Sequence, residues 1–284
     1  MNHTGDKPPN IPKYKTVAII PARFASTRLP GKALIEIAGK PMVCWVAERA
    51  LEARNVDRVI VATDSEEILR AVAARGIEVV LTSNQHTSGT DRVAEVAAGI
   101  SEAEIIVNVQ GDEPLISPQT IERAVDAMAA EMQRPDGAGI VTTWEPIVST
   151  TELLDANLVK VVVEDGDNAV YFSRSPVPHP RDAVKRHGSL EVALEEEPEL
   201  LKMFRKHTGL YVYRRDVLLE FTKWAQTQLE QVEALEQLRA LAHGVKIKVV
   251  AACTTSIGVD TPLDLERVRS TISELGSRTG ATNA

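Results

Sequence analysis

The sequence of 284 residues contains only two cysteines, Cys44 and Cys253. Two cysteines this far apart form no metal-binding or redox motif, so we expect both to be packing residues. The chain has no apolar run near the roughly 18–20 residues that a membrane-spanning helix needs. Its N-terminal stretch, MNHTGDKPPNIPK, lacks the apolar core of a signal peptide. We therefore expect a cytoplasmic protein without a membrane partner.

The chain also lacks an excess of positive charge. Its net charge is −8, whereas a general binder of nucleic acid or of anionic membranes needs a basic face. The charge argues against nucleic acid as a partner, but it leaves room for a small basic pocket that binds phosphates. With 44% hydrophobic and 25% charged residues, the composition is otherwise that of a globular protein.

Short apolar runs alternate with helical patterns in the first half of the chain. Ser65 and Ser117 are candidate N-caps of two of these helices. Because the apolar runs are brief and do not alternate with polar residues, they are typical of buried parallel strands. The alternation predicts an α/β fold with a doubly wound, mostly parallel sheet. The expected strands are 17–20, 59–62, 79–81 and 105–109, and the expected helices are 41–54, 65–75, 89–99 and 117–133.

The second half is less regular. A hairpin is expected across EDGDN, and HTGLYVYR alternates like a strand. The whole pattern predicts one α/β domain over 16–275 with a β-rich excursion at about 155–225. The polar ends, 1–15 and 276–284, are expected to be disordered. The remaining expected elements are strands at 159–163, 169–172 and 246–251, helical segments at 190–204 and 229–243, and a last helix from about 262.

Two familiar nucleotide-binding motifs are missing after the first strand. A Walker A loop needs a glycine five residues before its Gly-Lys pair and a Ser or Thr after it, but Ser26 and Ala33 occupy those places. The dinucleotide pattern G-x-G-x-x-G is missing as well. The loop is therefore neither a standard P-loop nor a standard NAD site.

The loop that does follow the first strand is PARFASTRLPGK, residues 21–32. In a parallel sheet, ligands bind beyond the carboxyl ends of the strands. Arg23, Arg28 and Lys32 together can meet about three or four negative charges, such as those of a nucleoside triphosphate. Gly31 lets the backbone approach phosphate oxygens. A solvated basic loop is the alternative interpretation.

This loop, read as IIPARFASTRLPGK, resembles the signature of sugar-activating nucleotidyltransferases, in particular the CMP-Kdo synthetase (3-deoxy-manno-octulosonate cytidylyltransferase) family. The resemblance covers roughly residues 16–272. It implies CTP and the sugar acid Kdo (3-deoxy-manno-octulosonate) as small-molecule partners, Mg²⁺ as cofactor, a homodimer, and a product used for lipopolysaccharide or another Kdo glycan. Further segments match in order: VIVATDSEEI, TSGTDRVAE, VNVQGDEPLI, YFSRSPVP, HTGLYVYR, LEQLRAL and GVDTPLDLERVR.

Two aspartates are the candidate metal ligands. Asp112 follows the strand in IIVNVQGDEP, and Asp260 lies in GVDTP beyond the strand at 246–251. Each has a structural alternative, Asp112 as a turn residue or cap and Asp260 as an N-cap. Two carboxylates at strand ends facing a triphosphate loop make a hard oxygen site for magnesium, and the resemblance assigns both to the metal. We expect Asp112, Asp260, Lys32 and Arg23 to be the catalytic residues.

The nucleotide is expected to contact the first loop and the segment after the third strand. The resemblance implies that Ser88, Gly89 and Thr90 bind the cytosine ring and ribose, although Ser88 or Thr90 can also be the N-cap of the next helix. Arg92 is expected to make phosphate or structural contacts, and Asp64 to cap the helix that follows it. The full nucleotide-binding prediction is Ala22, Arg23, Arg28, Lys32, Ser88, Gly89, Thr90 and Asp112.

The sugar acid is expected to bind in the second half. The planar fork of Arg174 in YFSR can hold a carboxylate, and His207 and Tyr211 share one face of a strand. Thr208 stands where the family often has a larger apolar residue, which leaves the identity of the sugar open. Most glutamates near 230–236 are expected on a solvated helix face. The full sugar-binding prediction is Gln110, Arg174, His207, Tyr211, Glu236 and Gln237.

The sequence thus predicts an enzyme that joins CTP to Kdo and releases pyrophosphate. One alternative is a cytidylyltransferase for another acid sugar, such as 8-amino-Kdo or a sialic acid, although FSR, HTGLY and LEQLR favour Kdo. The other alternative is a nucleotide-sensing domain without activity. The presence of Lys32, Asp112 and Asp260 argues against it.

Overall fold

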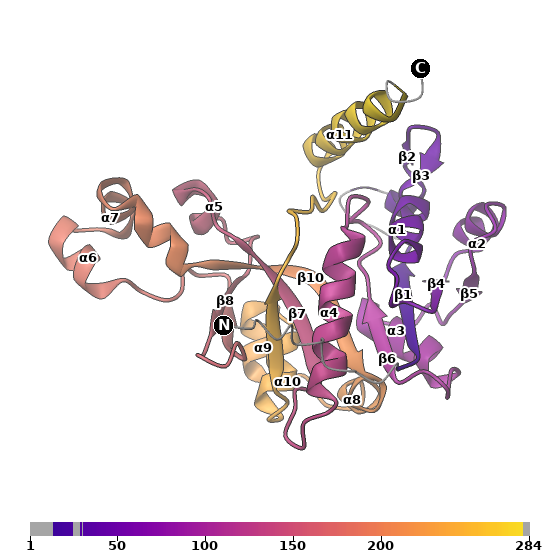
Figure 1. Cartoon of the computed structure of the whole chain (residues 1–284), viewed down its shortest axis with the longest axis horizontal. Helices are drawn as coiled ribbons and strands as arrows, with labels where there is room; N and C mark the ends of the chain where they lie inside the picture. The colour runs from indigo at the N-terminus through magenta and orange to yellow at the C-terminus, as the bar shows by residue number, and fades with distance from the viewer. Residues whose placement is uncertain (1–13, 25–28, 30, 281–284) are drawn as a thin grey trace, which may run out of the picture.

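The computed structural model describes residues 14–24, 29 and 31–280, with only the backbone described for 275–280. Its centre is a twisted sheet with helices on both sides, and an arm projects from one end of the molecule (Figure 1). The strands on the main path of the sheet are β1 (Thr16–Ala22), β4 (Arg58–Thr63), β5 (Val79–Leu81), β6 (Ile105–Asn108), β7 (Ile140–Pro146), β10 (Arg205–Arg214) and β11 (Ile247–Ala251).

The strand order along this path is β11-β7-β10-β6-β1-β4-β5. β1 is parallel to β4 and β6, β4 is parallel to β5, and β7 is parallel to β11. Because β10 is antiparallel to both β6 and β7, β7 and β11 point the same way as β1. The carboxyl ends of the six parallel strands therefore meet at one edge, together with the beginning of β10. This confirms the predicted mostly parallel sheet.

Strand β7 was not expected from the sequence. Its apolar run is interrupted by Thr142 and Thr143, which gives the segment a polar appearance. Both threonines are nevertheless fully buried, because the hydroxyl of Thr142 donates to the Leu210 carbonyl at 2.8 Å. A β-branched threonine whose hydroxyl finds a partner suits a central strand as well as valine does.

Helices cover both faces of the sheet, as a doubly wound fold requires (Figure 1). Alternate residues of β1 point to opposite faces: Ile20 packs with one core cluster and Ile19 with the other. The first cluster includes residues of α1 (Met42–Leu51), α2 (Glu66–Ala73) and α4 (Pro118–Glu131). The second includes residues of α3 (Gly89–Ala98) and α8 (Arg215–Phe221).

The excursion consists of a hairpin and an arm. The hairpin strands β8 (Lys160–Val163) and β9 (Ala169–Ser173) join the sheet beside β10. The arm contains α5 (Thr150–Leu154), α6 (Arg181–His187), α7 (Leu190–Glu196) and the 3₁₀ turn η2 (Pro198–Met203), and it extends away from the sheet in Figure 1. The helical segment expected at 190–204 is therefore divided, because Pro198 cannot continue the helix of its predecessors.

The helix expected at 229–243 is also divided. Ala234 adopts the left-handed conformation (φ 51°), which ends α9 (Gln228–Glu233) before α10 (Gln237–Ala242) begins. The last helix, α11 (Pro262–Gly280), packs its Val268 with Ile37 of the small hairpin formed by β2 (Glu36–Ile37) and β3 (Lys40–Pro41). It extends past residue 275, where the domain was expected to end.

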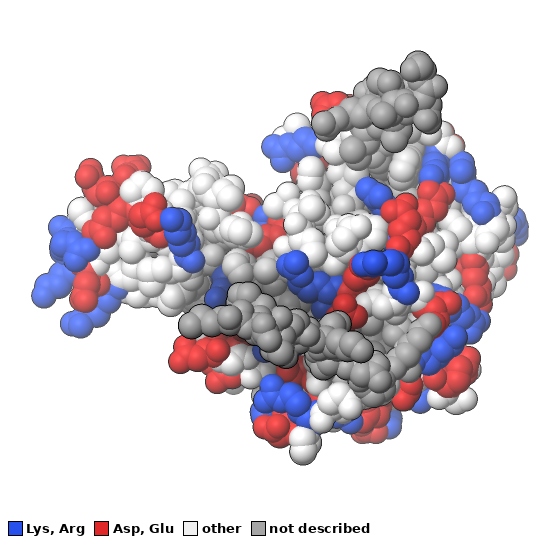
Figure 2. Space-filling view, viewed as in Figure 1, with Lys and Arg blue, Asp and Glu red and all other residues white. Residues whose placement is uncertain are grey.

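The surface agrees with the composition. On the face shown in Figure 2, basic and acidic side chains are interspersed and form no continuous basic surface. Among the residues that the structure describes, no helix combines the length and the apolar character that crossing a membrane demands.

Candidate active site

Lys32 lies between the two aspartates that the sequence singled out. It begins the 3₁₀ turn η1 (Lys32–Leu34), directly after Gly31 in the left-handed region (φ 66°). Its Nζ donates to Asp112 Oδ2 at 2.7 Å and to Asp260 Oδ1 at 2.9 Å. The three residues come from positions 32, 112 and 260, so the fold brings the predicted basic loop and both carboxylates to one point.

The charge of Lys32 is secured by this arrangement. Its side chain is only 13% exposed, and burial alone would lower the pKa of the ammonium group. The attraction of Asp112 and Asp260, with their hydrogen bonds, outweighs burial and raises that pKa above its usual value. The Lys32 ammonium group is therefore held between two carboxylates at the edge of the sheet where the carboxyl ends of the parallel strands meet.

Neighbouring side chains, and not that of Asp260, cap the start of the last helix. The hydroxyl of Thr261 accepts the Asp264 N–H at 3.2 Å, and the Asp264 carboxylate accepts the Thr261 N–H at 2.9 Å. This reciprocal pair satisfies the start of α11. The Asp260 carboxylate is directed instead to Lys32. The turn alternative for Asp112 coexists with a site role, because Gln110 and Glu113 close a turn around it.

Gly111 lets the turn that carries Asp112 lie directly on the end of β1. A Cβ at this position would stand 2.8 Å from the backbone oxygen of Pro21. A backbone oxygen in a central strand cannot move aside cheaply, so only glycine fits there. The close approach holds the turn that carries Asp112 next to the first loop.

Replacing Gly111 with alanine is expected to push the Asp112 turn away from the first loop. A displacement of about 1 Å in a catalytic site can lower turnover by about 10- to 100-fold, and we expect a loss in that range. Gly99→Ala is the matched control, because a Cβ there would meet its nearest neighbour at an ordinary 3.5 Å. Steady-state turnover and melting temperature of both variants test this. Normal turnover of Gly111→Ala would show that the turn has room to shift.

The nucleotide-binding prediction is only partly within the described residues. Arg28 lies outside them. Ala22 is the last residue of β1, and Arg23 Nη1 lies 3.4 Å from the Thr87 carbonyl, next to the TSGT segment. Ser88 is the N-cap of α3, since its hydroxyl accepts the Asp91 N–H at 3.0 Å. The structure thus places Ser88, Gly89 and Thr90 at a helix start beside the first loop, where the capping role and a ligand role are compatible.

The expected roles of Asp64 and Arg92 need correction. Ser65, not Asp64, caps α2, because the Ser65 hydroxyl accepts the N–H groups of Glu67 and Ile68. The Asp64 carboxylate instead accepts a hydrogen bond from Arg92 at 2.6 Å, and the Arg92 side chain is fully buried. Of the two roles expected for Arg92, the structural one holds: it ties the loops after β4 and β5 together.

Two of the residues predicted to bind the sugar acid lie on β10. His207 and Tyr211 have ring centres 5.3 Å apart, and the strand has a bulge between them. His207 Nε2 shares a hydrogen bond with the Thr142 hydroxyl at 2.9 Å. Burial lowers the pKa of His207 to about 3, so its ring is neutral near pH 7. A Cβ on Gly209 would come within 2.9 Å of Gln110 Cγ, so Gln110 lies against this bulge.

The guanidinium group of Arg174 is already engaged. Its Nε, Nη1 and Nη2 donate to the backbone carbonyls of Glu233, Ala156 and Ala234 at 2.7, 3.0 and 3.3 Å. These bonds use three of the five N–H groups of arginine. Arg174 therefore fixes the α9–α10 turn, and it retains donors that can meet a carboxylate.

The glutamates of α9 differ from the solvated face that the sequence indicated. Glu230 is buried and forms an ion pair with Arg239. Glu233 accepts the Ser173 hydroxyl at 2.7 Å and the Arg174 N–H at 3.0 Å. The expectation was wrong because it assumed one continuous helix, whereas the break at Ala234 lets α10 pack against α9 and brings Arg239 to Glu230.

Glu236, directly before α10, links this helix to the start of α3. Its Oε2 accepts the Thr90 hydroxyl at 2.7 Å, and its Oε1 is buried without a well-aligned partner among the described residues. Burial raises the pKa of Glu236, opposed by the hydrogen bond from Thr90. Gln237 follows as a buried residue at the start of α10. The Ser88 hydroxyl also stabilises the Glu236 carboxylate, so Glu236 meets two of the three residues predicted to bind the nucleoside.

Glu113 is a site neighbour that the sequence analysis missed. Burial raises its pKa to about 7, the negative charge of Asp112 adds to this, and the Ser256 hydroxyl opposes it. That hydroxyl contacts Glu113 without a well-aligned hydrogen bond. The signal was present in GDEP, where a second carboxylate follows the candidate metal ligand.

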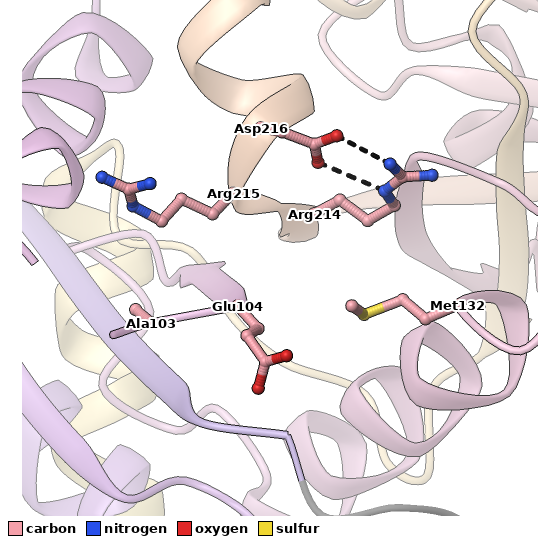
Figure 3. Close-up of a pocket in the computed structure, with 6 residues that line it drawn as sticks. All are labelled: Ala103, Glu104, Met132, Arg214, Arg215 and Asp216. Carbon is pink, nitrogen blue, oxygen red and sulfur yellow. Dashed lines mark hydrogen bonds and ion pairs between the residues drawn. The ribbon is translucent and has the colours of Figure 1, made fainter. Parts of the chain in front are cut away.

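A separate pocket lies at the opposite edge of the sheet, where β6 begins and β10 ends (Figure 3). Its cations serve internal contacts: Arg214 pairs with Asp216 at 2.6 Å, and Arg215 donates to the carbonyls of Ala97 and Ala98 at the end of α3. The pocket therefore shows no basic group directed to a ligand. It is lined by Ala103, Glu104, Met132, Arg214, Arg215 and Asp216.

The chain is similar in sequence and in structure to known cytidylyltransferases. The family model described as cytidylyltransferase matches residues 17–247. The chain is 52% identical over 254 residues to a 3-deoxy-manno-octulosonate cytidylyltransferase of Geobacter metallireducens, covering 89% of this chain and 96% of that protein. It is 48% identical over 256 residues to the protein of the same name from Yersinia pseudotuberculosis, again covering 89% and 96%. The solved structure of CMP:2-keto-3-deoxy-manno-octonic acid synthetase complexed with CTP has a TM-score of 0.81 at 41% identity, covering 92% of this chain and 99% of that one.

These matches show that the chain is a nucleotidyltransferase, and its doubly wound sheet with Lys32 and paired carboxylates at the carboxyl edge agrees with that class. The chain belongs to the cytidylyltransferase family, and within it to the group of 3-deoxy-manno-octulosonate cytidylyltransferases. The family resemblance, the fold and the enzyme class predicted from the sequence are thereby confirmed.

Proposed function

We propose that the chain transfers the cytidylyl group of CTP to the anomeric hydroxyl of Kdo. The sugar oxygen attacks the α-phosphorus in line, the bond to the bridging oxygen of the β-phosphate breaks, and pyrophosphate leaves. The observation that supports this most is the position of Lys32 between Asp112 and Asp260, on the loop that precedes the nucleotide segment. Homologues at about half identity carry the Kdo name.

The residues present fit a magnesium ion. Asp112 and Asp260 converge on one cationic group, and their side chains are 37% and 59% exposed, so a hydrated ion can reach them. Among the described residues there is no cluster of three or more His, Cys, Asp or Glu suited to a metal. Two carboxylates completed by phosphate oxygens and water match the preference of Mg²⁺. When bound, the ion neutralises phosphate charge and acidifies the attacking hydroxyl.

The protein's own groups provide positioning and charge. Lys32, with Arg23 and Arg28, balances the charge of the triphosphate and of the departing pyrophosphate. Ala22 and the segment Ser88–Thr90 hold the nucleoside. No covalent enzyme intermediate is needed, because orientation and preorganised electrostatics lower the barrier.

The sugar acid is held by the groups around β10 and α10. Arg174 meets its carboxylate with the N–H groups that the backbone carbonyls leave available. His207 offers Nδ1 to a hydroxyl because Nε2 is bound to Thr142. The remaining hydroxyl contacts are assigned to Gln110, Tyr211, Glu236 and Gln237.

Replacing Arg174 with alanine is expected to raise the KM for Kdo at least 30-fold and to change the KM for CTP less than threefold. Losing one partner of a buried charge pair costs roughly 2–5 kcal/mol. Arg174→Lys keeps the charge without the planar fork and should recover only part of the loss. Arg214→Ala, at the opposite edge of the sheet, is the control. An equal loss for both substrates would remove Arg174 from the sugar site.

The function is tested by pyrophosphate release with Mg²⁺ and paired substrates. We expect release with CTP and Kdo, and little with UTP. Sialic acid and 8-amino-Kdo are offered in place of Kdo, because Thr208 at the site floor leaves the choice of sugar open. A preference for either would replace Kdo as substrate, and no release with any of these sugars would overturn the proposal.

We further propose that the enzyme is a cytoplasmic homodimer whose product supplies lipopolysaccharide or another Kdo glycan. The arm supports a dimer because several large apolar side chains are exposed on it, and such surfaces mark interaction sites. Light scattering during size-exclusion chromatography tests this, and a monomer at micromolar concentration would contradict it. The exposed residues are Val148, Leu154, Val192 and Met203.

A further inference from the structure

The segment that carries Asp260 to the site has no helix or strand of its own. It runs over residues 252–261, between β11 and α11. Four backbone N–H groups in its second half have acceptors. Asp260 and Thr261 donate locally to the Asp264 carboxylate at 3.3 and 2.9 Å. The other two bonds tie the segment to distant parts of the chain: the Ser256 N–H donates to Glu145 Oε1 and the Val259 N–H to the Asp112 carbonyl, each at 2.9 Å.

One of these two distant acceptors is a buried carboxylate from another strand. Glu145 lies near the end of β7 and is 2% exposed. It stands opposite Lys206 of β10 in the sheet register, with 3.1 Å between its Oε2 and Lys206 Nζ. Lys206 also donates to Glu152 of α5 at 2.6 Å. Glu145 thus uses one oxygen for the lysine and the other for the Ser256 backbone.

Charge balance alone does not explain Glu145. Burying a carboxylate costs several kcal/mol unless it is well paired, and Lys206 already has Glu152 as a partner. Unlike Glu152, Glu145 uses its second oxygen to bind the backbone N–H of Ser256, four residues before Asp260. Ser256 also contacts a second glutamate, because its hydroxyl lies against Glu113. One acidic side chain therefore contacts the backbone of this serine and another contacts its side chain.

We propose that Glu145 is a positioning residue of the reaction. By holding the Ser256 N–H, it sets the path of residues 256–260 and so places the Asp260 carboxylate at the metal edge. This inference rests on the proposed metal role of Asp260. It predicts that losing the acceptor on Glu145 weakens the response to magnesium while leaving the first loop, and hence CTP binding, in place.

The test compares three variants of the full chain. Glu145→Met removes the acceptor but keeps similar volume. Glu145→Gln keeps an oxygen that can accept from Ser256. Glu152→Gln is the matched control, because it removes the negative charge of the other partner of Lys206 without touching residues 252–261. Two measurements are made: the Mg²⁺ concentration for half-maximal turnover at saturating CTP and Kdo, and amide hydrogen exchange of residues 254–260 in the metal-free enzyme.

For Glu145→Met we expect about tenfold more Mg²⁺ at half-maximal turnover, a CTP KM within threefold of the parent value, and faster exchange over 254–260. Glu145→Gln should recover most of both effects, and Glu152→Gln should show neither. In an Asp260→Asn background, Glu145→Met should add nothing to the magnesium response, since it acts through that aspartate.

Some outcomes overturn the positioning role alone. These are an unchanged magnesium response and exchange rate in Glu145→Met, an equal effect in Glu152→Gln, or a full effect of Glu145→Met in the Asp260→Asn background. A parental magnesium response of Asp260→Asn has a different meaning, because it overturns the metal site of the proposed function and the inference with it. The response of Asp260→Asn therefore separates the two failures.

Discussion

Lys32→Ala is expected to lower turnover by about 10²- to 10³-fold at saturating CTP, the usual loss when one preorganised electrostatic group is removed. The ammonium group is held by Asp112 and Asp260 at 2.7 and 2.9 Å, and in the proposed reaction the departing pyrophosphate gains charge beside it. If the same carboxylates hold the metal as proposed, the lysine competes with it, and its removal should lower, or leave unchanged, the Mg²⁺ concentration at half-maximal turnover. Steady-state kinetics over a magnesium series measures both quantities.

Lys40→Ala is the matched control for this experiment. Lys40 lies on the nearby β2–β3 hairpin, where it pairs with Glu48 and covers the Trp45 ring, and its side chain is 19% exposed. Its loss should cost some stability and no turnover. If Lys32→Ala keeps parental turnover at saturating CTP, the lysine only neutralises the carboxylates and has no part in catalysis.

The architecture could be predicted from the sequence where local pattern and tertiary burial agree. Val17–Ile20 is apolar throughout because β1 is covered on both faces, and Ser88 marks the start of α3 because it caps it. Asp112 and Asp260 could be proposed as a pair because both follow strands of one parallel sheet. Their convergence on Lys32 follows from that topology.

The sequence was misleading where a long-range partner determines the conformation. The threonines of β7 look polar until Thr142 finds the Leu210 carbonyl. Glu230 and Glu233 look solvated until Arg239 pairs with the first and Ser173 and Arg174 donate to the second. The hydrogen bond between Glu145 and the Ser256 N–H could not be predicted for the same reason, because no local sequence pattern relates the two residues. Polar side chains whose partners lie far away in the sequence are the ones that local patterns misplace.

Replacing either Asp112 or Asp260 with asparagine is expected to leave the fold intact and to lower turnover by about 10²-fold or more. Asn keeps the size and turn preference of Asp. At the start of α11, Asp264 pairs with the side chain of Thr261 and with the backbone N–H of Asp260, which the substitution keeps. Both carboxylates are more than a third exposed, so solvent screens their pairing with Lys32, and melting should change by only about 2 °C. Each substitution removes one negative charge from a hard-cation site, so half-maximal turnover should need more Mg²⁺, opposite in sign to Lys32→Ala.

The double variant, Asp112→Asn with Asp260→Asn, separates a shared ion from two independent roles. If both carboxylates act through one metal, the second substitution should add much less than the first, because the site is already lost. Added magnesium should restore part of the turnover of each single variant and little of the double. Melting temperature, magnesium titration and turnover of the two single variants and the double variant distinguish a shared ion from two independent roles. A single variant that melts normally and keeps parental turnover at low magnesium would show that its aspartate belongs to the turn or linker rather than to the site.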